Sequence, residues 1–370
     1  MKKSLSKITA VLFIFLLISP CCISAVQTTQ VYSIKEKFVV PTVDGSEITL
    51  TSYDGYKETP IIFIHGMGCN HWIYDVDKDH SLARYLNSKG WDVWLLDLRT
   101  HDGDGDFKYA IGSEREYIDR YWDFDNTLLK IDVVTAVDFV KNNSNSDKFF
   151  LSGHSYGGYL AYAYSMLIGE ENLSGIITTG ASPYDTPVYA HELFTSDMHN
   201  YGYFDGDYAY VKDDGKIATY HSTPRLFYVL TSLFWNFLNH SSTLLFYKQT
   251  TPYYIQKKCI FHSDAESAGV YVDMMFGKDP YKYNGSWVDP QTLYNYSDNM
   301  DKITVPILFI AGDEDPQDPS QDIYRAYENV SSINKEFYSF ANHSHMDLLM
   351  GNDASRLIFP KIDSFMNKYC

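Results

Sequence analysis

Residues 149–162, FFLSGHSYGGYLAY, carry the most informative local pattern of the chain. An apolar run typical of a buried strand is followed by GHSYG at 153–157 and then by a segment typical of a helix. A G-x-S-x-G pattern between a strand and a helix predicts a sharp turn that lifts the serine hydroxyl above the sheet. Gly-rich strand–helix turns also occur without chemistry, but both flanks match here, which favours Ser155 as a nucleophile.

Strand-like and helix-like segments alternate on both sides of this turn. Short apolar runs typical of buried strands occupy residues 60–68, 91–98, 148–153, 173–180, 305–312 and 335–340. Helical patterns occupy residues 79–90, 124–143, 156–169, 320–330 and 354–369. Residues 37–55 contain two β-rich runs around VDGS, which predicts an antiparallel hairpin. The alternation predicts a doubly wound α/β fold with a mostly parallel sheet.

The alternation stops between residues 182 and 300, where the chain is polar, aromatic and irregular, with helical patches. A loop of that length without structure of its own is unusual in a compact domain. We therefore expect a large, partly helical cap inserted between core strands 6 and 7. The predicted core then consists of residues 30–181 and 301–370.

The first 25 residues have the features of a secretory signal peptide. Three lysines precede an apolar core from Ile8 to Ile18, and small residues ending at Ala25 offer a cleavage point. An uncleaved membrane anchor is the alternative, because apolar character continues to Val26. We expect a secreted or extracytoplasmic protein. Seven Asn-X-Ser sequons fit a glycoprotein: Asn142, Asn172, Asn239, Asn284, Asn295, Asn329 and Asn342.

Charge and cysteine content exclude some classes of function. The formal net charge is −17, which argues against a nucleic-acid partner because phosphate binding needs a basic face. Removal of the leader leaves Cys69, Cys259 and Cys370, an odd number without the C-x-x-C spacing of a metal site. The 32 Tyr, 22 Phe and 6 Trp residues suggest aromatic surfaces or a binding cavity. We expect neither a metal nor an organic cofactor.

Candidates for the acid of a serine triad lie in the segment that follows the strand at 305–312. With a strand–turn–helix nucleophile, the triad occurs in the chain order Ser, acid, His. Four carboxylates compete in this segment: Asp313, Glu314, Asp315 and Asp318. Asp318 lies near the next helix start, where a helix-terminus role accounts for it. Position alone favours Asp315 and leaves the others open.

The base should follow the last strand, in the segment SFANHSHMDLLMG at 339–351. Both His343 and His345 lie in this loop, and their spacing barely separates them. Asp347 can start the following helix, which places His345 nearer the sheet edge and favours it slightly. If Asn342 carried a glycan, that glycan would lie beside the loop, so we expect this sequon to be empty.

An oxyanion hole needs two backbone N–H groups near the nucleophile. One is expected from Met67 in the glycine turn FIHGMG, which follows an earlier strand. The other is expected from Tyr156, directly after Ser155. An ordinary glycine turn is the alternative explanation for the segment around Met67.

Four stretches resemble the α/β-hydrolase superfamily, and within it the acid (gastric and lysosomal) lipase branch: HGMG at 65–68, GWDVWLLDLR at 90–99, YWDFDNTLLKIDVVTAVDFV at 121–140 and HMDLLMGNDA at 345–354. In that branch the base stands in an H-L-D-F-like element, which His345 begins. Its acid is three residues after the strand-end glycine, which here is Asp315. The resemblance thus implies an α/β-hydrolase fold with Ser155, Asp315 and His345 as the triad.

Two weaker features receive plain explanations. The stretch HDGDGD at 101–106 has calcium-loop-like spacing, but Ser113 stands where a bidentate Glu is needed, so an exposed acidic turn is expected. The aromatic stretch at 226–240 suits the interior of the cap, and it could also contact lipid transiently when a cap opens.

These features together indicate an exported serine hydrolase that cleaves carboxylic esters and is lipase-like or esterase-like. The expected partner is a small-molecule or lipid ester, and the oligomeric state is left open. The elbow has Tyr156 where the acid lipases more often have Gln, so general esterases, peptidases and polyester-active hydrolases remain alternatives. A capped peptidase of the aminopeptidase type is the nearest rival, and a non-catalytic binding protein is the rival of another class.

Overall fold

The computed structural model describes residues 35–66, 69–99, 124–184 and 294–370, together with four short strands between 209 and 288. The predicted signal peptide, the acidic HDGDGD turn and the aromatic stretch at 226–240 lie outside the described residues. Within the described part of the chain, no helix is long and apolar enough to span a bilayer.

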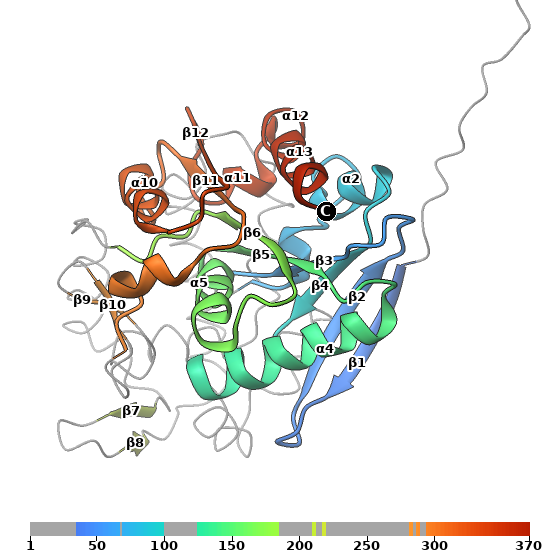
Figure 1. The fold of residues 1–370 in the computed structure, drawn as a ribbon, viewed down its shortest axis with the longest axis horizontal. Coiled ribbons are helices and arrows are strands. Elements are labelled where there is room, and N and C mark those ends of the chain that lie inside the picture. Colours follow the sequence, from blue (N-terminus) through green and yellow to red (C-terminus); the bar gives the residue numbers. More distant parts are fainter. Residues whose placement is uncertain are drawn as a thin grey trace, which may run out of the picture. The chain divides into compact units, whose positions relative to one another are not determined.

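An eight-stranded sheet forms the centre of the fold (Figure 1). In spatial order its strands are β1 (Lys35–Pro41), β2 (Glu47–Tyr53), β4 (Val93–Asp97), β3 (Ile61–Ile64), β5 (Phe149–His154), β6 (Leu173–Thr179), β11 (Ile307–Gly312) and β12 (Lys335–Phe340). β1 and β2 form the predicted antiparallel hairpin, and β2 pairs antiparallel with β4. All pairings from β4 to β12 are parallel, which confirms the expected mostly parallel sheet.

Helices cover both faces of this sheet (Figure 1). One face packs against η3 (Phe124–Val133), α4 (Val134–Asn143), α5 (Tyr156–Ala163), η4 (Tyr164–Ile168) and α10 (Ser320–Asn329). The other face packs against α2 (Leu82–Ser88), α11 (Asp347–Met350), α12 (Ala354–Leu357) and α13 (Phe359–Tyr369). Two short 3₁₀ helices, η1 (His71–Ile73) and η5 (Ser297–Lys302), lie in connections.

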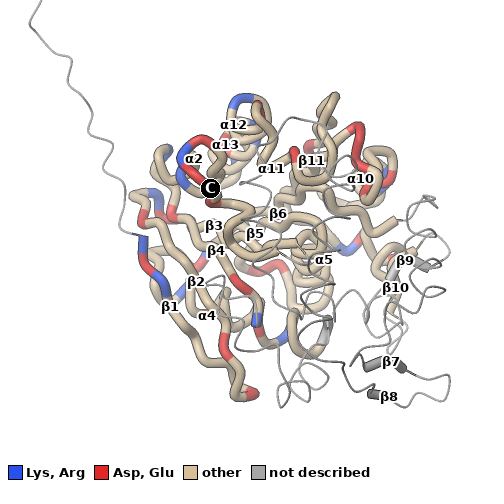
Figure 2. Tube along the Cα trace, turned by 180° about the vertical axis from the view of Figure 1, so that it is seen from behind, with Lys and Arg blue, Asp and Glu red and all other residues tan. Residues whose placement is uncertain are grey.

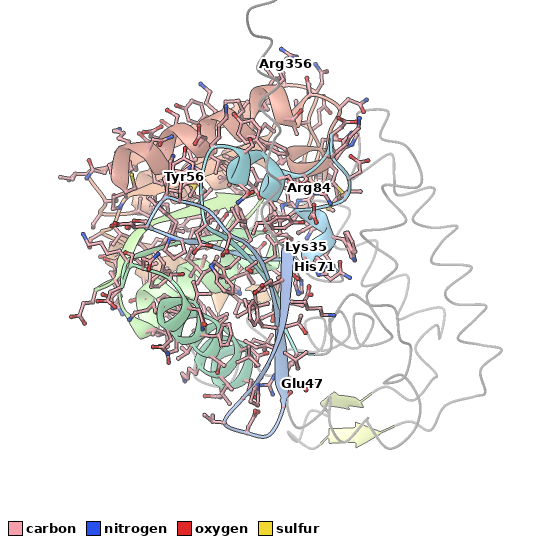
Figure 3. All side chains as sticks on the ribbon, turned by 90° about the vertical axis from the view of Figure 1, so that its right-hand side faces the viewer. Lys35, Glu47, Tyr56, His71, Arg84 and Arg356 are labelled. Carbon is pink, nitrogen blue, oxygen red and sulfur yellow. The ribbon has the colours of Figure 1, made fainter. Side chains whose placement is uncertain are left out.

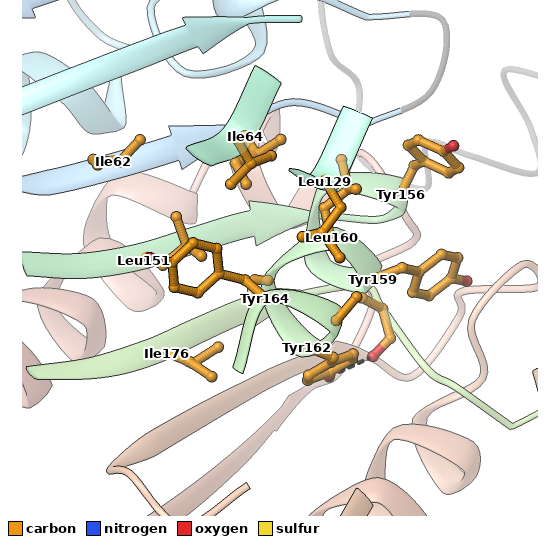
Figure 4. Packing of buried hydrophobic residues seen from close by; sticks show 14 of the residues in the cluster. Ile62, Ile64, Leu129, Leu151, Tyr156, Tyr159, Leu160, Tyr162, Tyr164 and Ile176 are labelled. Atoms are coloured by element: carbon orange, nitrogen blue, oxygen red, sulfur yellow. Dashed lines mark hydrogen bonds between the residues drawn. The ribbon is translucent and has the colours of Figure 1, made fainter. Parts of the chain in front are cut away.

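The two apolar clusters follow from the two-residue period of the strands. Ile62 and Ile64 of β3 point to the cluster under α5, whereas Ile61 and Phe63 point to the cluster under α2 and α13. All four side chains are buried, which is why this strand is continuously apolar. Figure 4 shows the first cluster, in which Leu160 of α5 lies among the side chains of the strands.

The last predicted helix, 354–369, is divided in two. α12 ends at Leu357 and α13 begins at Phe359, with Ile358 between them. Pro360 lies in the first turn of α13, where its missing N–H costs nothing, but it cannot continue a preceding helix. The helical pattern was correct, and its interruption has this local cause.

Four short strands lie where the cap is expected, between β6 and β11, the sixth and seventh strands of the main sheet in chain order. They form two antiparallel pairs, β7 (Ala209–Val211) with β8 (Ile217–Thr219), and β9 (Tyr281–Tyr283) with β10 (Ser286–Val288). The expected helical part of the cap lies outside the described residues. Trp287 of β10 is buried, and its ring stacks on Tyr296 with centroids 4.0 Å apart.

An ion cluster around the buried Asp75 carboxylate ties the first strand to helix α2. Lys35 and Arg84 (labelled in Figure 3) approach the Asp75 carboxylate to 2.9 and 2.6 Å. Tyr53 and Ser81 also donate hydrogen bonds to it. Burial alone would raise the pKa of Asp75, but the hydrogen bonds from Arg84 and Tyr53 and the charge of Lys35 outweigh it, so this pKa is lowered. Elsewhere acidic and basic residues are interspersed along the described trace (Figure 2).

Candidate active site

Ser155 lies at the turn between β5 and α5, at the carboxyl ends of the parallel strands. Its backbone angles are φ 53° and ψ −120°, a region that residues other than glycine rarely adopt. A Cβ at Gly153 would lie 2.1 Å from the Gly157 carbonyl oxygen, and one at Gly157 would lie 2.1 Å from the Ile64 carbonyl oxygen. Both glycines are therefore required by close packing, as the G-x-S-x-G pattern predicts.

His345 and Asp315 form a buried pair. The Nδ1 atom of His345 lies 2.7 Å from Oδ2 of Asp315. The side chains of His345 and Asp315 are 4% and 0% exposed, so water screens the pair little. The other oxygen of Asp315 accepts the backbone N–H groups of Gln317 and Asp318, at 2.9 and 3.0 Å. The carboxylate is thus held from one side and directed at the imidazole from the other.

His343 is engaged elsewhere. Its Nδ1 lies 2.9 Å from the carbonyl oxygen of Ala341, and its Nε2 lies 2.9 Å from Oδ1 of Asp353. The ring is 1% exposed. With both ring nitrogens occupied, His343 has the environment of a structural residue, which supports the choice of His345.

The remaining acid candidates are separated by burial. Asp313 and Glu314 are exposed, and Asp313 accepts a hydrogen bond from Ser339. Asp318 does not cap α10: its buried Oδ1 accepts from Tyr159 Oη at 2.7 Å, and its Oδ2 lies 3.9 Å from His345 Nδ1. The expected helix-terminus role for Asp318 is therefore wrong. Pro319 is the N-cap residue of α10 and no side chain caps the helix, while the Asp318 side chain accepts instead from Tyr159 and from the N–H of Ser182.

Contacts join the Ser155 turn both to the acid loop and to the His345 imidazole. Nε2 of Gln317, two residues after the acid, lies 3.4 Å from Ser155 Oγ. The rings of His154 and His345 pack with centroids 4.6 Å apart. Gly180, after β6, leaves room for the pair, since a Cβ there would lie 3.1 Å from His345 Nδ1. The three predicted triad members thus gather at the carboxyl edge of the sheet, where α/β folds bind ligands.

His154, inside the serine motif, is a buried neutral histidine that the sequence patterns did not single out. Its Nδ1 pairs with Thr179 Oγ1 at 3.1 Å. Burial, and then the charge of His345, lower the pKa of His154 well below 6.5. A histidine between an apolar strand and the serine is the only sequence signal for this arrangement.

The structure describes one of the two residues expected to form the oxyanion hole. Met67 lies outside the described residues, whereas Tyr156 is the buried first residue of α5, next to the serine. Gly66 adjoins the same turn, because a Cβ there would lie 3.3 Å from the serine Cβ. His65 accepts the N–H of Leu98 at Nε2 (3.2 Å), so its Nδ1 carries the proton and donates to the Gly66 carbonyl at 2.8 Å.

Asp132, in one of the lipase-resembling stretches, forms a buried ion pair with Arg99. Arg99 Nη2 lies 2.6 Å from Asp132 Oδ1, and Nε lies 2.9 Å from Oδ2. The two side chains are 1% and 0% exposed. Asp44, in the first hairpin turn, accepts from Arg99 Nη1 at 2.8 Å. The pair therefore ties the exit of β4 to helix η3 and to the hairpin.

Other candidate sites are sparse within the described residues. They contain no cluster of three or more His, Cys, Asp or Glu side chains able to hold a metal ion. Cys69 is buried and Cys370 exposed, both as free thiols, while Cys259 lies outside the described part. An open cavity of about 510 Å³ lies between Asp315, Tyr324 and Phe337 on the α10 side. Ser155 does not line it, so we do not assign it to substrate.

Comparisons with known proteins agree with this architecture. The family model described as the alpha/beta hydrolase fold matches residues 59–351. Lipase member N of Mus musculus is 22% identical over 370 residues, covering 90% of this chain and 88% of that protein. A probable lipase of Schizosaccharomyces pombe is 29% identical over 109 residues, 28% of this chain and only 22% of the relative.

Two solved structures show the same fold at low identity. An esterase of Exiguobacterium antarcticum has a TM-score of 0.56 and 17% identity, covering 89% of this chain and 98% of its own. The esterase RhEst1 of a Rhodococcus species has a TM-score of 0.56 and 15% identity, and the match covers 90% of this chain and 99% of the esterase chain. With a family match over most of its length and the corresponding sheet, this chain belongs to the α/β-hydrolase fold family.

Proposed function

We propose that this protein is a serine hydrolase that cleaves carboxylic esters through Ser155, His345 and Asp315. The observation that carries the proposal is the buried His345–Asp315 pair, 2.7 Å between Nδ1 and Oδ2, beside a serine held at φ 53°. A residue other than glycine held in such a backbone region costs about 1–3 kcal/mol, and strained residues of this kind cluster at active sites.

In the proposed mechanism, His345 Nε2 takes the proton of Ser155 while Oγ attacks the ester carbonyl. Asp315 keeps the other proton on Nδ1 and stabilises the imidazolium. The N–H groups of Met67 and Tyr156 stabilise the oxyanion. His345 then protonates the leaving alcohol, and water, activated by the same base, resolves the acyl-enzyme.

The substrate class is proposed from the surroundings of Ser155 and from the relatives. The rings of Tyr156 and Tyr159 lie on the side toward which the strand arrows point (Figure 4), and Trp287 packs on Tyr159 with centroids 5.0 Å apart. Aromatic side chains around a reactive centre suit an apolar acyl group. Lipase and esterase names among the relatives support a small-molecule or lipid ester.

The basic and apolar N-terminal segment supports the further proposal that the protein is exported and glycosylated at accessible sequons. Asn142 and Asn329 are exposed and lie in such sequons. Fractionation of expressing cells tests export, and the intact mass of the exported protein, before and after enzymatic deglycosylation, tests leader cleavage and glycosylation. A mass that retains residues 1–25 contradicts cleavage, and a mass unchanged by deglycosylation contradicts glycosylation.

The proposed activity is tested with p-nitrophenyl esters of increasing chain length and with aminoacyl anilides. Ester turnover that Ser155→Ala abolishes is the expected result. Turnover of anilides alone would favour a peptidase of the aminopeptidase type. A chain that turns over neither substrate and resists fluorophosphonate would be a binding protein, and either outcome overturns the proposal.

A further inference from the structure

A second buried carboxylate lies beside the proposed triad. The Oδ2 atom of Asp318 is 3.9 Å from His345 Nδ1, and the corresponding atom of Asp315 is 2.7 Å from it. The side chain of Asp318 is 0% exposed. Two carboxylates thus face one ring nitrogen, although a triad needs only one.

Asp318 also connects three parts of the site. Its Oδ1 accepts from Tyr159 Oη at 2.7 Å and from the backbone N–H of Ser182 at 3.0 Å. Tyr159 lies one turn after Ser155 on α5, and Ser182 follows β6 at the expected start of the cap. The backbone N–H of Asp318 donates to Asp315 Oδ1 at 3.0 Å. One residue therefore joins the nucleophile helix, the acid loop and the exit of β6.

We propose that Asp318 is a positioning residue of the proposed triad, whose negative charge makes His345 more basic and whose backbone N–H helps to hold Asp315 against His345. This inference rests on the proposed function. A charge 3.9 Å from the ring nitrogen, removed from water, is screened far less than a surface charge. Both donors to Oδ1 suit a carboxylate as acceptor.

Few titratable groups other than Asp315 and Asp318 face His345 among the described residues, so the effect of Asp318 on the protonation of His345 can be measured. His345 faces Asp315 and Asp318 from the acid loop and His154 from the end of β5. Burial, with the charge of His345, lowers the pKa of His154 well below its ordinary value, so His154 is neutral.

Asp318 itself faces two tyrosines of α5, Tyr159 and Tyr162. Burial raises the pKa of both phenols above their ordinary value, and the charge of Asp318 adds to the effect. Both phenols are therefore neutral between about pH 5 and 9. Over this range, the decrease in kcat/KM as the pH is lowered (the acidic limb of the pH profile) should follow the protonation of His345 in the electrostatic field of Asp315 and Asp318.

The test is the pH dependence of kcat/KM for a p-nitrophenyl ester in the full-length protein. Asp318→Asn removes the charge and keeps an acceptor for Tyr159, so the acidic limb should move to lower pH by about one to three units. Asp92→Asn is the matched control: Asp92 is a buried carboxylate that precedes β4, at the opposite end of the strands, and its replacement should leave the limb in place.

An unshifted limb in Asp318→Asn, whatever its rate, would show a merely structural residue and overturn the inference. If this variant does not fold, Asp318→Ser leaves space for a water that can accept the same donors, and the same shift is expected. Wild-type protein that reacts with neither the ester nor fluorophosphonate would contradict both the proposed function and this inference. An active wild type, with variants whose acidic limb lies at the same pH as that of the wild type, would contradict this inference alone.

Discussion

Replacing Asp315 by asparagine should abolish most of the activity without disturbing the fold. The side-chain oxygen of Asn can still accept the N–H groups of Gln317 and Asp318, but its amide N–H then faces His345 Nδ1. The imidazole would respond by carrying its proton on Nε2, the nitrogen that must accept the Ser155 proton. The substitution therefore removes a charge and selects the wrong tautomer.

The distance sets the size of this effect. A charge 2.7 Å from Nδ1 is worth about 6 kcal/mol at an effective dielectric of ~20, an upper value for the pair. At about 1.4 kcal/mol per tenfold change in rate, kcat/KM should fall by about 10³–10⁴-fold. The nearby charge of Asp318 opposes part of this loss, so we expect the lower end of the range.

The assay is kcat/KM for a p-nitrophenyl ester, with thermal unfolding as the check on folding. Asp313→Asn is the control, since Asp313 has an exposed carboxylate that contacts Ser339, and it should stay within about twofold of wild type. A folded Asp315→Asn protein within tenfold of wild type would refute this account of Asp315.

Three other predictions concern buried groups. His345→Ala should lower kcat/KM on the order of 10⁴–10⁶-fold, and His343→Ala less than tenfold per folded molecule; the reverse ranking in steady-state assays would exchange their roles. Arg99→Met leaves the buried Asp132 carboxylate without its cationic partner. The free energy of unfolding, measured with urea, should therefore fall by about 3–5 kcal/mol, and a decrease under 1 kcal/mol would contradict a tight pair. Because His154 stays neutral when folded while the unfolded chain binds a proton, stability should be complete above about pH 6.5 and fall as the pH is lowered, by up to about 1.4 kcal/mol per unit. His154→Gln should flatten that slope between pH 5 and 7 in chemical denaturation, and equal slopes would count against a neutral His154.

Much of the fold could be predicted because its elements have strong local patterns. Ile61–Ile64 is buried on both faces, so it appears as an uninterrupted apolar run, and Val137 and Val140 mark the buried stripe of α4. The spatial order of strands has no such local signal. β3 lies between β4 and β5 because of long-range pairing, which a single sequence does not display.

The site divides in the same way. Ser155 could be predicted because its backbone conformation demands glycines at fixed positions, which leave a mark in the sequence. Asp315 and Asp318 are three positions apart in one loop, and only the folded chain shows that both point toward His345. Position alone barely separates His343 from His345, whereas their tertiary partners, Asp353 for one and Asp315 for the other, distinguish them clearly.

The most direct test of the central claim is covalent labelling by a fluorophosphonate, located by peptide mass spectrometry. The account predicts one stoichiometric adduct on Ser155, lost in Ser155→Ala and formed far more slowly in His345→Ala than in His343→Ala. An adduct on another residue, or labelling of Ser155 that does not depend on His345, would contradict a Ser155–His345–Asp315 triad.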